Sequence, residues 1–432
     1  MDLLVPRRRI AVIGSGISGL ACAHVLGPHH EVVLYEADRR LGGHTNTLDV
    51  DDPVAGRLAV DTGFIVHNEP NYPNLVRLFR ELGVATVDTD MSFGVTDRDP
   101  TSPTVGFTYR ASNLDTLFAD RRNLANPTMW RLLSEIARFY RRARKLLAEP
   151  DPSISLDDFL DANRFSRDFV ELHLRPMGAA VWSADPSMFG QFPAITLLTF
   201  LKNHGLLGVG RRPVWRTIPG GSRTYVDAIA AGFSGQIRVN SPVTGIERSV
   251  DGCVMVSTPH GIDTFDAVVL AVHSDQALNM LTRPTPAERA ILGAIRYQPN
   301  RATLHTDASL LSPVRKAWAA WNYDRREGDQ KEATVTYDMT TLQHLPGSRR
   351  YLVSLNSDAF IDPASMLATI DYAHPLFDRP AIEAQRRFET LDGVGGVHFC
   401  GAWWGHGFHE DGITSALRVC ERLGVRWNLV SE

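Results

Sequence analysis

The sequence predicts an α/β fold in which a discontinuous domain built on a parallel sheet is joined to a second, α+β domain. Two observations predict this fold. A short apolar strand, a glycine turn, a helix and another strand follow one another at the start of the chain, and similar strand patterns return near residues 237–272 and 395–402. Because the chain leaves this pattern and comes back to it, we expect separate segments to assemble the first domain.

The length of the chain supports this division. At 432 residues it exceeds the size at which a single hydrophobic core keeps growing, so two domains are expected. We assign residues 1–70, 213–282 and 393–432 to the first domain. Residues 71–212 and 283–392 are assigned to the second domain.

The first glycine turn lies between an apolar strand at residues 10–13 and a helix expected at residues 17–26. Gly14 permits the sharp bend, Gly16 lets the backbone approach a pyrophosphate, and Gly19 lets the helix pack close to the sheet. The start of the helix then offers free N–H groups and the positive end of its dipole to a phosphate. The turn therefore predicts a dinucleotide site.

Two later features narrow the ligand. Glu36 ends the next apolar strand, twenty-two residues after Gly14, where its carboxylate is placed to bind a ribose 2′-hydroxyl and to repel a 2′-phosphate. Gly42 and Gly43 follow six residues later and give a second close backbone approach to the same extended ligand. A plain nicotinamide-binding unit does not need this second bend, so a larger adenine dinucleotide is indicated.

Composition excludes several classes of protein. Hydrophobic residues make up 44% and charged residues 22%, as in an ordinary soluble globular protein. The net charge of −4 and a pI near 6.4 give no reason to expect nucleic-acid binding. The four cysteines form no C-x-x-C pair, which favours a reducing compartment over a disulfide framework or a zinc site.

The N-terminus resembles a secretory signal, because three arginines at 7–9 precede an apolar run. The same residues are needed for the first strand and its phosphate turn, so we interpret them as structural. No uncharged apolar stretch reaches the length of about 18 residues needed for a membrane-spanning helix. We therefore expect a cytoplasmic protein.

The middle of the chain predicts helices at residues 71–82 and 127–147, and a serine-capped helix start at Ser155. On the long helix we expect Trp130, Leu133, Ile136, Ala137, Tyr140, Ala143 and Leu147 to share the apolar side. The opposite side carries Arg131, Arg138, Arg141, Arg142, Arg144 and Lys145. This basic side is typical of a solvated helix face, and it also suits an anionic membrane surface or an acidic partner protein.

A second pattern of strand, glycine turn and helix lies near the C-terminus. An apolar strand at 395–400 leads through Gly401 and a loop rich in Trp, Gly and His into a helix expected at 415–423. A second helix N-terminus in this place suits a flavin ring, because the reduced flavin carries negative charge near its pyrimidine edge. The spacing of His398, His406 and His409 matches no helical metal-ligand pattern, so we predict no metal site.

With these residues in place, the chain resembles the FAD-dependent amine oxidase and phytoene desaturase superfamily, in its predicted NAD/FAD-binding, amine-oxidase-like branch. Members carry the dinucleotide fingerprint, a ribose glutamate, a Gly-Gly-Arg-Thr loop, an Asp-x-Gly segment and a C-terminal Gly-Asp … Glu-Gly-Ala motif. The chain offers Gly42-Gly43-His44-Thr45, Asp61-Thr62-Gly63, Gly401-Ala402 and Glu410-Asp411-Gly412-Ile413 at these positions. The resemblance implies a Rossmann-like FAD-binding domain and a separate substrate domain.

The cofactor implied is FAD, without a covalent link because no cysteine occupies the loop position that carries covalent flavin in monoamine oxidases. The residues assigned to FAD are Gly14, Ser15, Gly16, Ile17, Ser18, Gly19, Glu36, Ala37, Gly42, Gly43, His44, Thr45, Gly63, Phe64, Ile65, Val243, Ala271, Gly401, Ala402, Gly412 and Ile413. Two of them depart from the family pattern, since His44 stands in place of arginine and Ala402 in place of aspartate. We expect the backbone N–H groups of Gly401 and Ile413 to hold the flavin where that aspartate is missing.

The reaction expected is hydride transfer from a substrate to FAD. His409 and His406 are the predicted proton-transfer residues, because histidine titrates near neutral pH. Trp403 and Trp404 are predicted to contact the substrate, either as a channel wall or as a cation–π cage, with packing at the domain junction as the alternative.

The substrate expected is a hydrophobic small molecule, because the segment 189–207 is unusually apolar. Members of the branch are associated with lipid-modifying enzymes such as cyclopropane fatty acid synthases, so the leading hypothesis is desaturation or oxidation of a lipid-like or fatty-acyl substrate. Two alternatives stay open: oxidation of an amine, and a flavin-binding partner protein of a lipid-modifying enzyme that makes contact through the basic helix.

Overall fold

The structure is a computed structural model of the chain and describes residues 6–182, 189–208, 213–326 and 334–427. Its first domain is built on a five-stranded parallel sheet in the order β10-β2-β1-β14-β20. The strands are β1 (Arg9–Ile13), β2 (Glu31–Tyr35), β10 (Gln236–Arg238), β14 (Ala267–Leu270) and β20 (Val397–Phe399). Strands from three distant parts of the chain thus lie side by side, which confirms the discontinuous Rossmann-like α/β fold.

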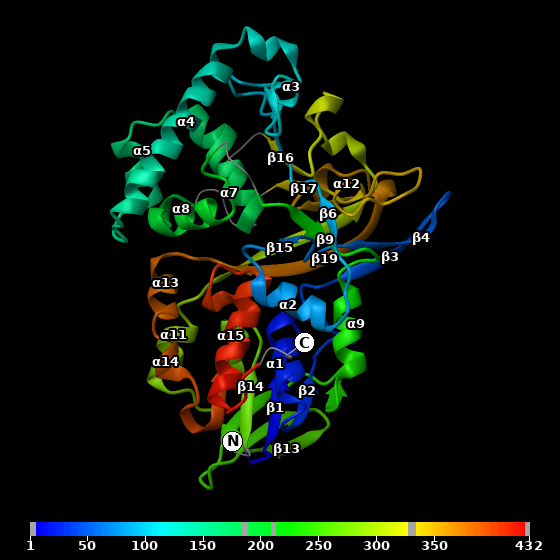
Figure 1. Cartoon of the computed structure of the whole chain (residues 1–432), viewed down its shortest axis with the longest axis vertical. Helices are drawn as coiled ribbons and strands as arrows, with labels where there is room; N and C mark the ends of the chain where they lie inside the picture. Colours follow the sequence, from blue (N-terminus) through cyan, green and yellow to red (C-terminus); the bar gives the residue numbers. More distant parts are fainter. Residues whose placement is uncertain (1–5, 183–188, 209–212, 327–333, 428–432) are drawn as a thin grey trace.

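Helices cover this sheet and bury its apolar strands (Figure 1). They are α1 (Ile17–Leu26), α2 (Pro73–Glu81), α9 (Arg223–Gly232), α10 (Ser274–Met280), α11 (Pro286–Leu292), α13 (Arg379–Gln385), α14 (Phe388–Leu391) and α15 (His409–Arg422). A small antiparallel sheet of β11 (Gly245–Arg248), β12 (Val254–Thr258) and β13 (Gly261–Phe265) extends the same domain. Among the residues described, no helix has both the length and the apolarity to cross a membrane.

The helices α1 and α15 approach closely because Gly412 has no side chain. A Cβ atom at Gly412 would lie 2.8 Å from Cγ2 of Ile17 and 2.9 Å from Oγ of Ser18. Both helices begin on the same side of the sheet, beyond the carboxyl ends of β1 and β20. The contact therefore brings two helix N-termini from opposite ends of the chain to one place.

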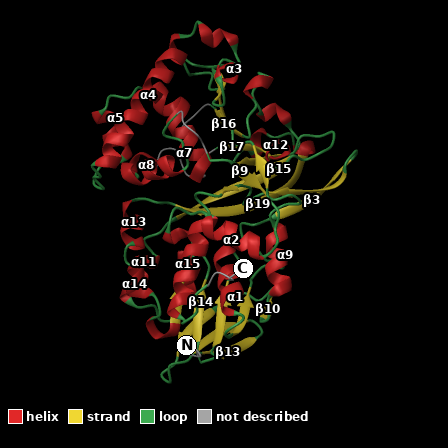
Figure 2. Ribbon diagram, viewed as in Figure 1, coloured by secondary structure: helices red, strands yellow, loops and turns green. Residues whose placement is uncertain are grey.

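The second domain contains a seven-stranded mixed sheet in the order β19-β15-β18-β17-β16-β7-β8. Its strands are β7 (Phe93–Asp97), β8 (Thr108–Arg110), β15 (Tyr297–His305), β16 (Trp321–Arg325), β17 (Val335–Asp338), β18 (Leu352–Leu355) and β19 (Met366–Pro375). Its helices are α3 (Leu114–Leu117), α4 (Pro127–Ala148), α5 (Leu156–Ala162), α6 (Arg167–Phe169), α7 (Arg175–Trp182), α8 (Ala194–Asn203) and α12 (Met339–Leu342). Figure 2 shows β15 and β19 lying across the boundary between the two domains.

Two small sheets complete the fold between the domains. The hairpin of β3 (Thr47–Asp52) and β4 (Gly56–Asp61) projects from the molecule at the right of Figure 1. The strands β5 (His67–Asn68), β6 (Val87–Thr89) and β9 (Trp215–Thr217) pair near the domain boundary. The chain thus passes from one domain to the other through paired strands.

The observed packing differs from the predicted domain assignment near three of the predicted boundaries. α2, predicted in the second domain, buries Leu75 and Leu78 in the core of the first domain. α11, α13 and α14, also predicted in the second domain, pack in that same core. Conversely, Val60 and Val66 pack in the core of the second domain, although residues 1–70 were predicted in the first. The boundaries at 70, 283 and 392 therefore move, because short helices at a junction pack on whichever sheet lies nearer.

The long helix α4 forms as predicted, and its buried side overlaps the predicted stripe in part. Its buried apolar residues are Met129, Leu132, Phe139 and Ala143, of which Ala143 was predicted, whereas Trp130 is 53% exposed. The predicted Leu133, Ile136, Tyr140 and Leu147 are partly buried against the core, because the apolar residues of the helix span a broad arc. On the basic side, Arg131 pairs with Asp168.

We expect a valine at Gly412 to destabilise the protein, because its side chain would clash with Ile17 and Ser18. Overpacking of this kind costs about 1–3 kcal/mol in the free energy of unfolding. Urea denaturation measures the loss. Gly232→Ala is the matched control, since a Cβ atom at Gly232 meets no atom within 4 Å and should leave the free energy of unfolding unchanged or slightly higher. Equal stability of the Gly412→Val variant and wild type would contradict the close contact.

Candidate active site

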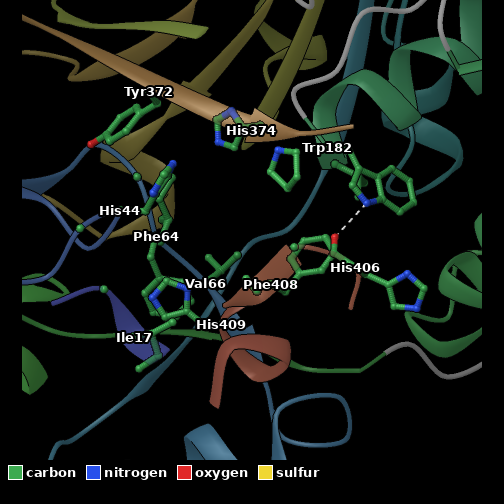
Figure 3. Close-up of a pocket in the computed structure, with 18 of the residues that line it drawn as sticks. Ile17, His44, Phe64, Val66, Trp182, Tyr372, His374, His406, Phe408 and His409 are labelled. Carbon is green, nitrogen blue, oxygen red and sulfur yellow. Dashed lines mark hydrogen bonds between the residues drawn. The ribbon is translucent and has the colours of Figure 1, made fainter. Parts of the chain in front are cut away.

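A single large cavity of about 850 Å³ joins the two glycine bends of the first domain to the apolar interior of the second. One end is lined by Glu36, Ala37 and Val243, and the glycine turns follow. Beyond them the wall is made by residues of β19, α7, α8 and the loop before α15. Figure 3 shows Tyr372 and His374 reaching the cavity from β19.

The first glycine turn has the geometry that an anion site needs. Gly14 adopts a φ of +95°, and a Cβ atom there would lie 2.6 Å from the carbonyl oxygen of Ala271. At Gly16, which precedes the first residue of α1, a Cβ atom would meet no atom within 4 Å. No side chain caps α1 and no acid lies in its first turn. The helix therefore offers its free N–H groups to the cavity.

Ser15 ties the two glycine bends to the ribose acid. The Glu36 carboxylate accepts hydrogen bonds from the Ser15 backbone N–H at 2.9 Å and from the Ser15 hydroxyl. The Gly42 N–H donates to the Ser15 carbonyl oxygen at 3.0 Å and lies 3.1 Å from the Ser15 hydroxyl oxygen. Gly43 then passes so close to Gly16 that a Cβ atom on Gly43 would lie 3.1 Å from the Gly16 Cα. The main chain of both bends thus surrounds one end of the cavity.

These observations fit an FAD molecule. The open space at Gly16 and the uncapped start of α1 suit the diphosphate. The position of Glu36 at one end of the cavity suits the ribose. Most residues assigned to FAD line the cavity: Gly14, Ser15, Gly16, Ile17, Ser18, Glu36, Ala37, Gly42, Gly43, His44, Gly63, Phe64, Ile65, Val243, Ala271, Gly401 and Ala402. The predicted cofactor residues therefore converge from both ends of the chain.

Four of the assigned residues support the site from outside the cavity wall. Gly19 packs on the first turn, since a Cβ atom there would lie 1.8 Å from the Gly14 carbonyl oxygen. Gly412 and Ile413 lie in the contact between α1 and α15. The Thr45 hydroxyl hydrogen-bonds His409 at 3.0 Å.

Three expectations for the C-terminal loop need correction. The Gly401 N–H is not a free donor, because it donates to Oγ of Ser415 at 2.9 Å. Ile413 lies in the second turn of α15, is fully buried and does not line the cavity. Trp404 packs edge-on against Phe388 with ring centroids 5.0 Å apart, away from the cavity wall. Trp403 lines the cavity and donates to the Val272 carbonyl oxygen at 3.0 Å, so only one of the two tryptophans reaches the site.

His409 and His406 both line the cavity, but the surroundings of His409 differ from those of a general base. The His409 ring stacks on Phe64 with centroids 3.7 Å apart, and its Nε2 lies 3.1 Å from the Tyr225 hydroxyl. Burial lowers the pKa of His409 to about 3. The ring is therefore neutral at physiological pH and acts through hydrogen bonds. The backbone carbonyl of His406 accepts a hydrogen bond from Trp182 at 3.2 Å (Figure 3).

A cluster of three histidines was not predicted. His44 lies 5.3 Å from His374 and 5.9 Å from His273 between ring centroids, and it stacks on Tyr372 at 4.8 Å. Burial lowers the pKa of each of the three histidines. Tyr372 and His374 are two residues apart on β19 and so share one face of the strand. The alternation of side chains along β19 can be recognised in the sequence. The sequence does not indicate which loop this face of the strand contacts.

Asp61 holds the segment that follows it against both domains. Its fully buried carboxylate accepts hydrogen bonds from the hydroxyls of Thr47 at 2.6 Å and Ser222 at 2.7 Å, and from the Gln343 amide at 3.0 Å. Burial raises the pKa of Asp61 to about 6. Asp61 therefore positions the cavity-lining residues 62–66 without contacting the cavity itself.

Comparison with known proteins decides the family. A sequence profile of the flavin containing amine oxidoreductases matches residues 17–314, more than half of the chain. The chain belongs to this family. FAD is thus its cofactor, and the chain is a member of a family of flavin-dependent oxidoreductases.

Individual relatives are distant. The flavin-containing amine oxidase A of Canis lupus familiaris is 24% identical over 301 residues, which cover 65% of this chain and 52% of that protein. The match thus spans about half the length of the relative. Cyclohexylamine oxidase from Brevibacterium oxydans has a similar fold, with a TM-score of 0.66, 18% identity and coverage of 97% and 100% of the two chains. A CLA-producing fatty acid isomerase from P. acnes gives a TM-score of 0.67, 15% identity and coverage of 96% and 98%.

The low pKa of His409 predicts a specific dependence of stability on pH. Between about 3 and the ordinary value of 6.5, the unfolded chain binds a proton that folded His409 does not, so stability falls as the pH is lowered through this range. The variant His409→Phe keeps an aromatic ring against Phe64 and removes the titrating group. Between about pH 7 and pH 5, it should lose about 2 kcal/mol less stability than wild type, as measured by chemical denaturation.

The control for this measurement is Phe64→Leu, which removes the aromatic stack and leaves the imidazole in place. Its stability should be lower by a similar amount at every pH. Parallel pH curves for wild type and His409→Phe would show that His409 titrates normally in the folded protein.

Proposed function

We propose that this oxidoreductase removes a hydride from a neutral, lipid-like or fatty-acyl substrate. The observation that supports the proposal is the character of the cavity wall beyond the glycine turns. Apolar and aromatic side chains make up most of it: Val66, Met91, Phe93, Met177, Val181, Trp182, Phe200, Leu206, Trp215, Trp321, Leu355, Phe377 and Phe408. Such a wall favours a hydrocarbon chain, because the burial of each CH₂ group contributes about 0.8 kcal/mol.

The charges on this wall argue against a cationic amine. Among the described residues that line the cavity, Asp90 is the one carboxylate outside the ribose end. It forms an ion pair with Arg110 at 2.6 Å and accepts a hydrogen bond from the Ser92 N–H at 2.8 Å. An ammonium group would therefore lose its water without gaining a free carboxylate, which is costly in an apolar cavity.

The fold itself does not separate these substrates, since it also occurs in a protein named cyclohexylamine oxidase and in one named fatty acid isomerase. Bound FAD supplies the hydride acceptor. The protein's own residues orient the substrate and exclude water, and the aromatic wall formed by Trp182, Phe200 and Phe408 supplies both effects.

Anaerobic mixing of the FAD-loaded protein with candidate substrates tests the proposal. Uncharged acyl esters of increasing chain length should bleach the visible flavin absorbance, whereas primary and secondary amines of similar length should not. Product analysis by mass spectrometry should then show the loss of two hydrogens. Bleaching by amines alone would establish amine oxidation instead. Bleaching by neither class would favour the flavin-binding partner protein.

A charged residue in the apolar wall should impair the same reaction. Leu206 lines the cavity just after α8, so Leu206→Glu should lower kcat/KM for acyl substrates by at least about tenfold, because an apolar chain bound there would strip water from the carboxylate. FAD affinity should stay unchanged. Val250→Glu introduces the same charge at a fully exposed residue and serves as the control. An unchanged kcat/KM in Leu206→Glu would place the substrate elsewhere.

A further inference from the structure

The cavity that holds FAD contains little positive charge of its own. Among its described lining residues there is no lysine or arginine, and the carboxylates of Glu36 and Asp90 add negative charge. The diphosphate of FAD is a dianion, which must be balanced when it leaves water. The start of α1 balances part of this charge through its dipole, equivalent to about half an elementary charge. A cation beside the diphosphate would balance more of it, and the described lining residues supply no lysine or arginine for this.

An arginine of the same loop, Arg40, is directed elsewhere. The Arg40 guanidinium wraps around the second glycine bend and donates to the carbonyl oxygens of Gly43 at 2.8 Å and Thr45 at 3.2 Å. It also lies 3.7 Å from the carboxylate of Asp38. Arg40 therefore braces the loop and has its donors engaged by carbonyl groups.

His44 stands at the point where a cation is missing. It follows Gly43, which touches Gly16 of the diphosphate turn, and its ring lines the cavity. Its Nε2 atom is buried and has no hydrogen-bond partner. The neighbouring His374 differs, because its Nδ1 accepts a hydrogen bond from the Asn300 amide at 2.8 Å, which fixes its proton on Nε2. The His44 ring thus carries a buried nitrogen that no described residue engages.

No carboxylate stabilises a charged His44 in the resting protein. The titratable groups that act on it are Arg40 from its own loop, His273 from the start of α10, His374 from β19 and His409 from α15. Tyr372 stacks on the ring. Burial and these groups together hold the pKa of His44 well below its ordinary value, so the ring is neutral. An anion brought beside it would supply the missing opposite charge and raise that pKa.

We propose that His44 takes up a proton from solvent when FAD binds, so that the imidazolium balances part of the charge of the diphosphate. One N–H bond forms on the ring, no bond breaks, and the free protein releases the proton when FAD leaves. Cofactor loading is therefore coupled to pH. This inference concerns FAD binding and does not depend on the substrate proposed above.

The direction in which pH changes the affinity for FAD follows from the number of protons bound in each state. Between the low pKa of His44 in the free protein and its raised pKa in the complex, binding consumes a proton. The affinity for FAD therefore falls as the pH rises, by up to about tenfold per pH unit across this window. Above the raised pKa the complex no longer holds the extra proton, and the affinity becomes independent of pH.

The test is an FAD titration of the apoprotein, followed by flavin fluorescence from about pH 6 to pH 9. Wild type should bind FAD less tightly as the pH rises. Calorimetry in two buffers of different ionisation enthalpy should show net proton uptake. His44→Arg carries a permanent charge and should bind FAD tightly with neither a pH slope nor proton uptake. His44→Gln should bind weakly, again without slope or uptake.

His204→Gln is the matched control. His204 is another buried histidine of the same cavity, but it stacks on Phe200 and Trp215 in the second domain, away from the glycine turns. Its variant should keep the wild-type slope and proton uptake. The proposal is overturned if His44→Arg, whose folding is verified by circular dichroism, retains the wild-type slope and proton uptake, or if wild type binds FAD without taking up a proton.

Discussion

The close contact between α1 and α15 is the constraint on which the rest of the structure depends. It exists because Gly412 leaves no side chain between the helices, so that Ile17 and Ser18 pack directly on the C-terminal helix. The contact fixes the start of both helices at one edge of the parallel sheet. The glycine turn before α1 and the loop before α15 then form opposite walls of the same cavity. Without this contact, the two ends of the chain would each carry half of a binding site.

Two buried or half-buried carboxylates tie separate segments together near this edge. Asp61 accepts donors from β3, from the turn before α9 and from the loop after α12, so one buried carboxylate orders three segments. Glu410 acts similarly at the start of α15, since its carboxylate accepts the backbone N–H groups of Asn74 at 3.1 Å and Leu75 at 3.0 Å. α2 is thereby capped by a side chain of the C-terminal helix, which explains why it packs in the first domain.

The sequence predicted the parts of the site that depend on local geometry. The turn at Gly14 and Gly16, the acid at Glu36 and the second bend at Gly42 each need a particular residue type at a particular spacing, and so they can be recognised without the fold. The seven-stranded sheet could not be predicted in the same way, because its order brings β7 beside β16 across more than two hundred residues. The histidine cluster depends on that order, since His374 meets His44 only after β19 crosses the domain boundary.

Trp404 and His409 show a second limit of prediction from sequence. Residue type suggested a substrate contact for the tryptophan and proton transfer for the histidine, but burial changes both roles. Trp404 lies behind Trp403, with ring centroids 4.2 Å apart, and faces the core. His409 is enclosed by Phe64, Thr45 and Tyr225, so the cost of burying its charge exceeds what two hydroxyl groups return.

The same cost of burial lowers the pKa of His44, His273 and His374, and this gives the site its chemical character. A wall of buried imidazoles and aromatic rings, whose one carboxylate outside the ribose end among the described lining residues, Asp90, is paired with Arg110, offers an ion no free partner of opposite charge. The cofactor end differs because main-chain N–H groups and a helix dipole are available there. A ligand that spans both ends is therefore sorted by polarity along its length, with its phosphates at the glycine turns and its apolar part toward the second domain.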